Sequence, residues 1–579
     1  MAARAWTPKT RQWQLAQPFE GAAELARELG TSELVAQVLH NRGVGTAAEG
    51  KAFLNPKLTD LHDPLLLSGV KEAAGMVARA VAAGSKIVIY GDYDVDGMTA
   101  VAILHACLKM LGAKAEFYVP HRLEEGYGVN AEAIAKIVAD GCRLLITVDC
   151  GISAAQPLAA AVAAGVEVIV TDHHSLGDVL PKAAIVHPRL GQYPNVDLSG
   201  AGVAFKLAWQ VAREVGGHDR VDQAMRDFLV EATCLAALGT IADVVPLRGE
   251  NRVLATYGLR GLPSTRHEGL RALLHSADLA GEKLDAYHVG FVLGPRLNAC
   301  GRMGHAGLAV ELLTDAPQAR CREIADFLAN QNIERQTIEK SIADHAAEMV
   351  VAQGLDREDS RAIVLSCDQW HGGVIGIVAS RMVDRFNRPA VLIAINEDGV
   401  GHGSARSIPG FHMRDALAAC GEHLLSFGGH AMAGGLKIQP ARIPDFTAAL
   451  QRYAQANVTA EQLAPPLVID AEATLAQLGY NVVAQLEKLA PYGEGNPPPV
   501  VAIRGCKLLA DPRRMGRSGN AVSLNIAQGN ARMRAVGFGM GDLADRLRGV
   551  NTIEIAAEPC LNRFNGSVSV ELKLKDVAW

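Results

Sequence analysis

KIVIYGDYDVDGMTAVAILHACLKMLG, residues 86–112, decides the fold of this chain. Residues 86–90 are a short β-rich run, and residues 98–112 repeat apolar side chains at the spacing of a helix. The loop between them, residues 91–97, carries aspartates at alternate positions between two glycines. A strand, an acidic loop and a helix in this order are typical of a parallel sheet whose strands alternate with helices.

The same alternation continues after this stretch. Continuous apolar runs predict strands that are buried on both faces of a parallel sheet, and the patterned segments between them predict the covering helices. The predicted strands are 115–120, 142–149 and 166–172, and the predicted helices are 130–141 and 153–165. Residues 200–262 are mainly helical in pattern, and we expect them to close this first domain.

A second α/β unit starts near Arg361, where a strand, a helix and a strand are predicted over residues 361–395. The segment 315–354 before it is long and polar, lacks proline after its start and ends at a glycine. This pattern predicts one bridging helix, although two shorter helices with a break would also fit.

The character of the chain changes again after about Leu467. Short alternating runs are separated by Gly and Asn turns, and Asn565-Gly566 is a strong signal for a β-hairpin. About five strands in this length fit a small barrel, and we expect an OB-fold, a barrel that commonly binds single strands.

The expected fold class is therefore α/β with a C-terminal β-barrel. A domain with a parallel sheet and a smaller α/β domain are joined by a long helix, and the barrel follows them. The expected bounds are a helical lead-in 1–50, a catalytic domain 51–314, a connecting helix 315–354, a smaller domain 355–460 and the barrel 461–579.

Composition excludes several classes of protein. The length of 579 residues predicts about three or four domains. No apolar run approaches the ~20 residues that cross a bilayer, and the first residues lack the apolar core of a secretory signal. We therefore expect a cytoplasmic protein without membrane contact.

Charge and cysteine content narrow the kind of binding site. The net charge of −6 argues against a surface coated with basic residues, but a local basic groove remains compatible with it. The ten cysteines are scattered without a CxxC pair. They predict reduced buried thiols and give no support to a zinc–thiolate site.

Three aspartates in one short loop suggest a bound cation. Asp92, Asp94 and Asp96 alternate in GDYDVDG, and an extended loop would point all three the same way. Such carboxylates would repel each other unless a divalent cation lay between them. A calcium loop of the EF-hand type is the first rival, but its distal glutamate is missing here.

Two further clusters follow the later predicted strands. Asp149 ends the strand of ITVDCG, and Asp172, His173 and His174 end the strand of IVTDHH. A single aspartate at a strand end is often only a cap or a turn residue. Three acidic clusters at equivalent strand ends instead predict a site at the carboxyl edge of the sheet.

The donor set favours hard divalent cations. Carboxylate and imidazole ligands suit Mn²⁺ or Mg²⁺, and two such ions are the usual arrangement for hydrolysis of phosphodiesters. A further acidic ligand is then needed, and Asp243 in GTIADVVPL, at the end of a helical run, supplies it.

The four motifs GDYDVDG, VDCG, TDHH and GTIADVVPL resemble, in this order, the metal motifs of the DHH phosphoesterases. Within that group the chain is most similar to the RecJ family. The similarity continues through further motifs at 119–128, 296–304, 401–407, 427–435 and 491–499.

The resemblance implies a 5′→3′ exonuclease of single-stranded DNA that releases mononucleotides and acts in recombination and repair. It implies Mn²⁺ or Mg²⁺, with two ions, and a core of DHH and DHHA1 domains around a central hole, followed by the OB domain. It also implies a monomer that works with a single-strand-binding protein and a recombination helicase.

Site roles follow from the same resemblance. The implied metal ligands are Asp94, Asp96, Asp149, His173 and Asp243. Asp92 is either a ligand or a base that orients the attacking water. Relatives that act on small nucleotides carry a histidine where this chain has Tyr90, so Asp92 would take over part of that role. His174 would contact phosphate or orient its neighbour.

Several motifs offer groups that could hold the strand. Ser404 and Arg406 in GHGSARS could bind a 5′-phosphate, and His430 in FGGHAMAGG could donate to a phosphate oxygen. Arg122 and Tyr127 in VPHRLEEGYG combine a cation with a ring on which a base could stack. Each of these groups could instead be structural, as part of a turn or a sheet edge.

Arg296 and Arg302 in RLNACGRMG are candidates for the same phosphate pocket, and one of them could instead be a structural ion-pair partner. Two rival functions fit part of the pattern. A hydrolase of short oligonucleotides or cyclic dinucleotides would not need the added barrel. A DNA-binding scaffold with a dead site would be expected to have lost some of its metal ligands.

Overall fold

The computed structural model describes residues 11–121, 125, 128–218, 220–302, 305–357, 359–396 and 399–579. The chain divides into two compact units, which are described separately. The N-terminal unit contains Glu20–Asn332 and Gln485–Pro498. The C-terminal unit contains Ile333–Ala484 and Pro499–Trp579, together with the residues that precede Glu20.

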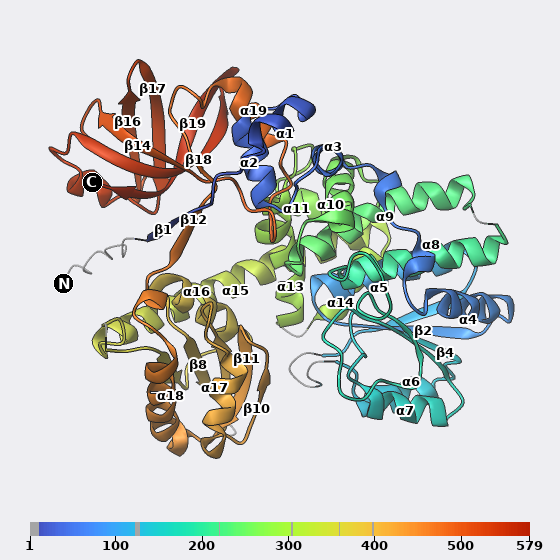
Figure 1. The fold of residues 1–579 in the computed structure, drawn as a ribbon. Helices are drawn as coiled ribbons and strands as arrows, with labels where there is room; N and C mark the ends of the chain where they lie inside the picture. The colour runs from blue at the N-terminus through green and yellow to red at the C-terminus, as the bar shows by residue number, and fades with distance from the viewer. Residues whose placement is uncertain are drawn as a thin grey trace. The chain divides into compact units, whose positions relative to one another are not determined.

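The N-terminal unit contains a parallel sheet that lies between layers of helices (Figure 1). Its strand order is β3-β2-β4-β5-β6, and every neighbouring pair is parallel. The strands are β2 (Lys86–Gly91), β3 (Lys114–Tyr118), β4 (Leu144–Val148), β5 (Glu167–Thr171) and β6 (Ala184–Val186). The order reverses between β2 and β4, which is the position where open α/β sheets bind their ligands.

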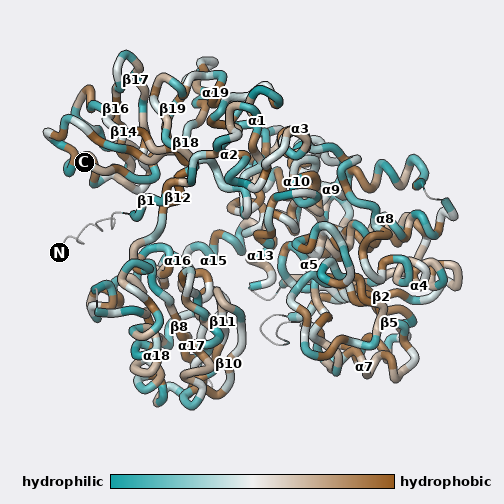
Figure 2. The backbone as a smooth tube through the Cα atoms, in the orientation of Figure 1, coloured by the Kyte–Doolittle hydropathy of each residue, from teal (hydrophilic) through white to brown (hydrophobic). Residues whose placement is uncertain are grey.

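Helices bury both faces of this sheet, as the continuous apolar strands predict. Ile87 and Ile89 face a core built with α4 (Val70–Ala82), α5 (Val95–Met110) and α8 (Gly200–Gly216). Val88 and Tyr90 face the other core, built with α6 (Ala131–Ala139) and α7 (Ala155–Ala163). Figure 2 shows the apolar character of β2. Burial of each such apolar side chain stabilises the fold by about 1.5–3 kcal/mol.

The rest of the N-terminal unit is helical. A second small core joins α2 to Leu486 and Leu489, which arrive from far along the chain. The remaining helices are α1 (Ala22–Leu29), α2 (Glu33–Asn41), α3 (Ala47–Leu54), α9 (Gln223–Ala242), α10 (Gly249–Gly261), α11 (Glu268–Ser276), α12 (Ala286–His288), α13 (Gly294–Arg302) and α14 (Ala306–Leu313).

One unbroken helix, α15 (Gln318–Ala352), spans 35 residues where a bridging helix was predicted, so the alternative of two shorter helices is wrong. The residues before α1 also contain a strand, β1 (Gln12–Leu15), which pairs in parallel with β12 (Pro466–Ile469) of the same unit. Among the helices that the structure describes, none is long and apolar enough to cross a bilayer.

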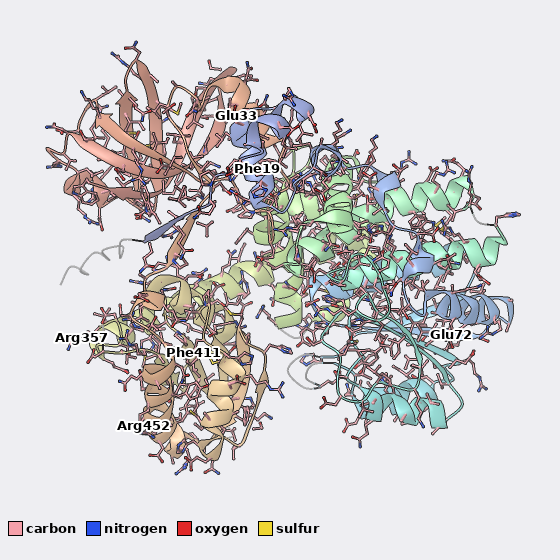
Figure 3. The ribbon with its side chains drawn as sticks, viewed as in Figure 1. Phe19, Glu33, Glu72, Arg357, Phe411 and Arg452 are labelled. Atoms are coloured by element: carbon pink, nitrogen blue, oxygen red, sulfur yellow. The ribbon has the colours of Figure 1, made fainter. Side chains whose placement is uncertain are left out.

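The C-terminal unit contains a mixed five-stranded sheet of order β10-β11-β9-β8-β7. One face packs on α16 (Ile375–Phe386), and the other packs on α17 (Met413–Ala419) and α18 (Ile443–Asn457). Phe411 lies inside this region, whereas Arg452 is exposed at its surface (Figure 3). The strands are β7 (Ile363–Cys367), β8 (Ala390–Ile395), β9 (Gly401–Arg406), β10 (Ser426–Gly429) and β11 (Ala433–Ile438).

The predicted C-terminal barrel is confirmed. Pairing between β14 and β16 closes the strand order β14-β18-β19-β17-β16 on itself. Asn565 and Gly566 both have positive φ in the hairpin turn, 48° and 76°, as a two-residue turn of type I′ requires. The elements are β13 (Ala471–Glu472), α19 (Tyr480–Glu487), β14 (Val501–Leu508), β15 (Arg513–Met515), β16 (Ala521–Gln528), β17 (Ala531–Phe538), α20 (Leu543–Arg546), β18 (Thr552–Phe564) and β19 (Ser567–Ala578).

Candidate metal centre

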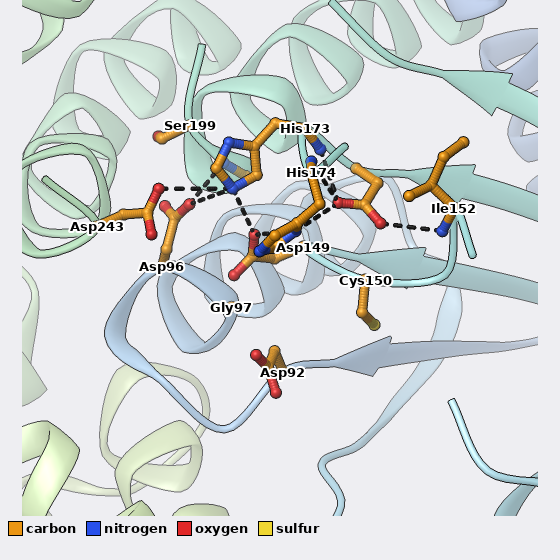
Figure 4. Close-up of polar contacts among 12 residues, drawn as sticks. Asp92, Asp96, Gly97, Asp149, Cys150, Ile152, His173, His174, Ser199 and Asp243 are labelled. Atoms are coloured by element: carbon orange, nitrogen blue, oxygen red, sulfur yellow. Dashed lines mark hydrogen bonds and ion pairs between the residues drawn. The ribbon is translucent and has the colours of Figure 1, made fainter. Parts of the chain in front are cut away.

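Acidic and imidazole side chains meet at the carboxyl edge of the parallel sheet (Figure 4). Asp92 follows β2, Asp149 follows β4 and His173 lies two residues beyond β5. Asp243 joins them from the C-terminal end of α9. The cluster thus lies at the topological switch point of the sheet, where parallel strands direct the following loops to one place.

The imidazole of His173 is the centre of the cluster. Its Nε2 lies 3.1 Å from Asp149 Oδ1, 3.5 Å from Asp243 Oδ2 and 3.8 Å from Asp96 Oδ2. Two strands and two helices therefore deliver four ligand-type atoms to one small volume.

Three overlapping groups could each hold a cation, with ligand atoms within 4.8 Å of one another. Two of the groups share Asp149, and two share His173. The groups are Asp92 with Asp94 and Asp149, Asp96 with His173 and Asp243, and Asp149 with His173 and His174. An arrangement in which one carboxylate belongs to two groups suits a pair of neighbouring ions.

The aspartate run is not extended, which corrects one expectation from the sequence. Asp94 is the N-cap of α5, and its Oδ1 accepts a hydrogen bond from the Gly97 N–H at 3.0 Å. The helix begins at the next residue and turns Asp96 away from Asp92 and Asp94. Asp96 therefore joins His173 and Asp243, and the run supplies two groups instead of one.

Two glycines make room for these carboxylates. Asp96 accepts hydrogen bonds from the backbone N–H groups of Gly200, at 2.6 Å, and Ala201, at 2.9 Å, in the first turn of α8. A Cβ at Gly200 would lie 2.5 Å from Asp149 Oδ1, and one at Gly239 would lie 2.3 Å from Asp96 Oδ1. Sequence reasoning missed both positions, because a glycine within a helical pattern does not reveal what lies against it.

Backbone conformation at the cluster is unusual. Asp149 has φ of 58° and Val244, directly after Asp243, has φ of 60°. Left-handed backbone is uncommon for any residue with a side chain and is a genuine outlier for a β-branched one. Strain of about 1–3 kcal/mol for each such residue is typical of functional sites.

Asp172 organises the histidine pair, a role that the sequence did not reveal. Its Oδ1 accepts from the backbone N–H of His173, at 2.7 Å, and lies 2.8 Å from His174 Nδ1. Its Oδ2 accepts from the Ile152 N–H at 3.0 Å. Burial alone would lower the pKa of His174, but the bond to Asp172 and the nearby carboxylates outweigh burial and raise it to about 9.

Without a cation, the carboxylates oppose each other's ionisation. Burial and repulsion from Asp94 raise the pKa of Asp96 to about 7, and burial and repulsion from Asp96 raise the pKa of Asp243 to about 8. Burial and repulsion from Asp96 raise the pKa of Asp149 well above its usual range. Burial lowers the pKa of His173 to about 3, so its imidazole is neutral at pH 7.

These donors fit a divalent cation. Asp149 Oδ1 and His173 Nε2 are both buried and lie 3.1 Å apart, but neither makes a hydrogen bond of suitable geometry within the described part of the chain. An unsatisfied buried polar atom costs about 1–3 kcal/mol, and an ion between the two atoms would satisfy both. A neutral imidazole among carboxylates is a donor set that suits Mn²⁺ and Mg²⁺.

Two predicted phosphate-binding residues lie together in the C-terminal unit. Ser404 and Arg406 are on β9, and Arg406 Nη1 donates to Ser404 Oγ at 3.1 Å. A Cβ at Gly376, in the first turn of α16, would lie 2.9 Å from Ser404 Oγ and 3.2 Å from Arg406 Nη2. Both side chains thus adjoin a helix N-terminus, which favours anions. His430 is exposed in the turn before β11, whose Ala433 pairs with Arg406.

The remaining candidates are on other segments of the chain. Arg296 and Arg302 are on α13 of the N-terminal unit, where Arg296 Nη1 donates to the Val292 carbonyl at 2.7 Å. Arg122 and Tyr127 fall outside the described residues.

Comparison with known proteins agrees with this architecture. Residues 86–237 match the DHH family N-terminal domain, residues 359–456 match the DHHA1 domain and residues 469–576 match the RecJ OB domain. The single-stranded-DNA-specific exonuclease RecJ of Bacillus subtilis is 38% identical over 572 residues, which are 98% of this chain and 71% of that protein. The RecJ of Escherichia coli is 33% identical over 575 residues, which are 96% of this chain and 97% of its own.

Solved structures agree as well. The crystal structure of RecJ in complex with Mn²⁺ from Thermus thermophilus superposes with a TM-score of 0.84 at 32% identity. The match covers 98% of this chain and 79% of that one. The Mg²⁺ complex from the same organism gives a TM-score of 0.78 at 31% identity, and it covers 98% of this chain and 78% of that one. The resemblance inferred from the motifs is confirmed, and the chain belongs to the RecJ family of single-stranded-DNA-specific exonucleases.

Proposed function

We propose that this chain hydrolyses single-stranded DNA from its 5′ end and releases 5′-mononucleotides in a reaction that depends on Mn²⁺ or Mg²⁺. The observation that carries the proposal is the cluster around Asp149 Oδ1 and His173 Nε2, two buried atoms that make no hydrogen bond of suitable geometry in the described structure. The names and bound metals of the relatives support the choice of substrate and ion.

Five side chains would hold the metal: Asp94, Asp96, Asp149, His173 and Asp243. When bound, a pair of divalent ions would neutralise the carboxylates, make a water more acidic and stabilise charge on the leaving oxygen. Asp92 adjoins Asp94 and Asp149 in one of the groups and is either a ligand or a base that orients water.

Other residues of the chain position these groups. Asp172 fixes the ring of His174 through Nδ1, which leaves Nε2 as the nitrogen that could contact a phosphate. The backbone N–H groups of Gly200 and Ala201 fix both oxygens of Asp96. Such fixed partners keep a reacting geometry ready before the substrate arrives.

Ser404, Arg406 and the N-terminus of α16 would bind the 5′-phosphate, because a guanidinium and a helix N-terminus both favour phosphate oxygens. His430, Arg296 and Arg302 would add contacts to the strand. A phosphate anchor for the strand end would set the polarity of cleavage.

The proposed functional segments are a lead-in 1–50, a catalytic domain 51–314, a connecting helix 315–354, a second domain 355–460 and a barrel 461–579. We also infer a cytoplasmic monomer whose partners are a single-strand-binding protein and a recombination helicase, as the family resemblance implies. Light scattering after gel filtration tests the monomer, and copurification with each purified partner tests the interactions.

The main test compares substrates in a titration of Mn²⁺. A 40-mer of single-stranded DNA with a 5′-phosphate should be degraded to mononucleotides from that end, and a chelator should stop the reaction. A dinucleotide, a cyclic dinucleotide and a blunt duplex are the comparison substrates. Cleavage of only the dinucleotides would overturn the exonuclease proposal, and absence of any metal-dependent cleavage would indicate a binding scaffold.

A further inference from the structure

An exposed pair of aromatic rings lies in the segment that precedes α13 of the N-terminal unit. Tyr287 and Phe291 stack on each other with ring centroids 5.0 Å apart and an interplanar angle of 24°. Their exposed fractions are 63% and 68%, although aromatic residues of this size usually bury most of their surface. We call this pair the aromatic platform.

The helix beneath the platform is shaped to present it. Val289–Leu293 is a π-helical turn, and Val289 and Leu293 point into the core while Phe291 faces out. A Cβ placed on Gly290 would meet no atom within 4 Å, so the space at this residue, next to Phe291 in the chain, is open. A π-helical turn is an uncommon and less stable variant of the α-helix that recurs at functional sites.

The turn that carries Phe291 packs against the helix that delivers Asp243. The π-helical turn packs against the end of α9, and a Cβ at Gly294 would lie 3.7 Å from Cβ of Ala242. Ala242 directly precedes Asp243, a proposed metal ligand. The segment that carries the rings is therefore packed against the residue that precedes a proposed metal ligand.

An arginine contacts the backbone of the segment that carries the rings. Arg296 Nη1 donates to the carbonyl of Val292, the residue after Phe291, at 2.7 Å. Its Nε is buried and has no partner among the described residues, so the guanidinium keeps unused donor capacity. A ring pair and a guanidinium on one short segment suit one nucleotide, whose base can stack while its phosphate is paired.

We propose that Tyr287 and Phe291 stack against a base of the single strand close to the scissile phosphate and so hold the strand in register with the metal cluster. This inference rests on the proposed function and adds to it a binding site for one base. A base stacks through its face, so the site would accept all four bases, as an exonuclease without sequence preference requires.

The test combines two variants with oligonucleotides that lack a single base. Phe291→Leu and Tyr287→Leu keep apolar volume but remove the ring. Each should raise KM for a 5′-phosphorylated strand about tenfold, equal to about 1.4 kcal/mol, while kcat stays close to wild type. Phe291→Trp should retain the wild-type KM, and Tyr480→Leu, which changes a ring 55% exposed in the C-terminal unit, is the matched control.

Abasic substitutions locate the stacked base. Wild type should lose about tenfold in kcat/KM when an abasic site occupies one or two positions near the 5′ end. Phe291→Leu should show no further loss at those positions, because the missing interaction is the same. Strand binding in the Asp149→Ala background, measured by fluorescence anisotropy, should repeat the pattern without cleavage.

Several outcomes would overturn the platform. One is a wild-type enzyme whose kcat/KM is unchanged by an abasic site at any position. Another is an abasic site that lowers kcat/KM by the same factor in wild type and in Phe291→Leu. Unchanged strand kinetics in both leucine variants would indicate that the rings serve a protein contact instead. If wild type neither cuts nor binds any strand, the proposed function fails together with the platform, whereas normal cleavage with unchanged variants removes the platform alone.

Discussion

The parallel sheet of the N-terminal unit and the mixed sheet of the C-terminal unit are both covered by helices on two faces, yet they present opposite chemistry. The first gathers carboxylates and a neutral imidazole at the ends of β2, β4 and β5. The second presents Ser404 and Arg406 on β9 beside the N-terminus of α16.

The two sites differ in the elements that build them. The first consists of loops that follow parallel strands, and the second lies beside the N-terminus of a helix. Loops after parallel strands can carry any side chain, and here they carry acids that repel one another until a cation arrives. A helix N-terminus carries unpaired N–H groups and a partial positive charge, which favour a phosphate. If the first site binds cations and the second binds the 5′-phosphate, as we propose, substitutions in the two units should affect different kinetic quantities.

The largest effect is expected in the metal cluster of the N-terminal unit. Asp149→Ala removes the carboxylate that two ligand groups share, and kcat should fall by at least about 1000-fold, or about 4 kcal/mol. Strand binding should remain, because Asp149 is not among the residues proposed to bind the phosphate. Single-turnover cleavage and fluorescence anisotropy measure the two quantities. Wild-type turnover in this variant would remove Asp149 from the metal site.

The second-largest effect is expected at Gly200, whose backbone lies against Asp149. Gly200→Ala places a Cβ 2.5 Å from Asp149 Oδ1 and should weaken Mn²⁺ activation about 10- to 100-fold, the range typical of groups that orient metal ligands.

Gly216→Ala is the matched control, because it lies in the same helix and its added Cβ would meet nothing within 4 Å. The half-activating Mn²⁺ concentration measures both variants. Equal effects of the two changes would show that the close approach at Gly200 is unimportant.

A smaller effect is expected at the proposed phosphate site of the C-terminal unit. Arg406→Ala removes the guanidinium beside the first turn of α16. The preference for a 5′-phosphorylated over a 5′-hydroxyl strand should fall about tenfold, since a charge-assisted hydrogen bond contributes about 1.5–3 kcal/mol. Cleavage of the 5′-hydroxyl strand, measured in parallel, should stay near wild type. An unchanged preference would move the phosphate site elsewhere.

The smallest effect is on stability in the absence of metal. The pKa values of Asp96 and Asp243 are raised to about 7 and about 8, whereas an unfolded aspartate titrates near ~3.9. Between these values the folded state binds more protons than the unfolded state, so stability should fall as pH rises from about 4 to 8. Melting curves of chelator-treated protein should show a declining Tm across this range, and Mn²⁺ should remove the decline. A rise in Tm with pH would contradict the mutual repulsion of these carboxylates.

The sequence predicts the parts of the site that depend on local pattern. The strands that end before Asp92, Asp149 and His173 follow from continuous apolar runs, and each of these residues lies in the cluster. Asp243 could be predicted only as an acid needed from elsewhere, and the structure places it 3.5 Å from His173.

The rest depends on contacts between segments that are distant in the chain. The fit of Gly200 against Asp149 and the exposure of Phe291 arise from tertiary packing, which no local spacing reveals. The separation of Asp96 from Asp94 has a local cause. Asp94 is the N-cap of α5, so the side chains after it follow the spacing of a helix and do not alternate as in an extended loop. Asp172 anchors the histidine pair through bonds to His173 and His174, and its bond to Ile152 comes from a different loop.

The return of Gln485–Pro498 to the N-terminal unit has a consequence for synthesis on the ribosome. Val35 and Leu39 complete their core with Leu486 and Leu489, more than 400 positions later. At the usual 5–20 residues per second, the ribosome needs roughly 8–30 seconds after Asn332 to reach Gln485. During that interval the first helices of the nascent chain keep an apolar surface uncovered, so the early part of the protein is a natural client for chaperones that shield such surfaces until translation is almost complete.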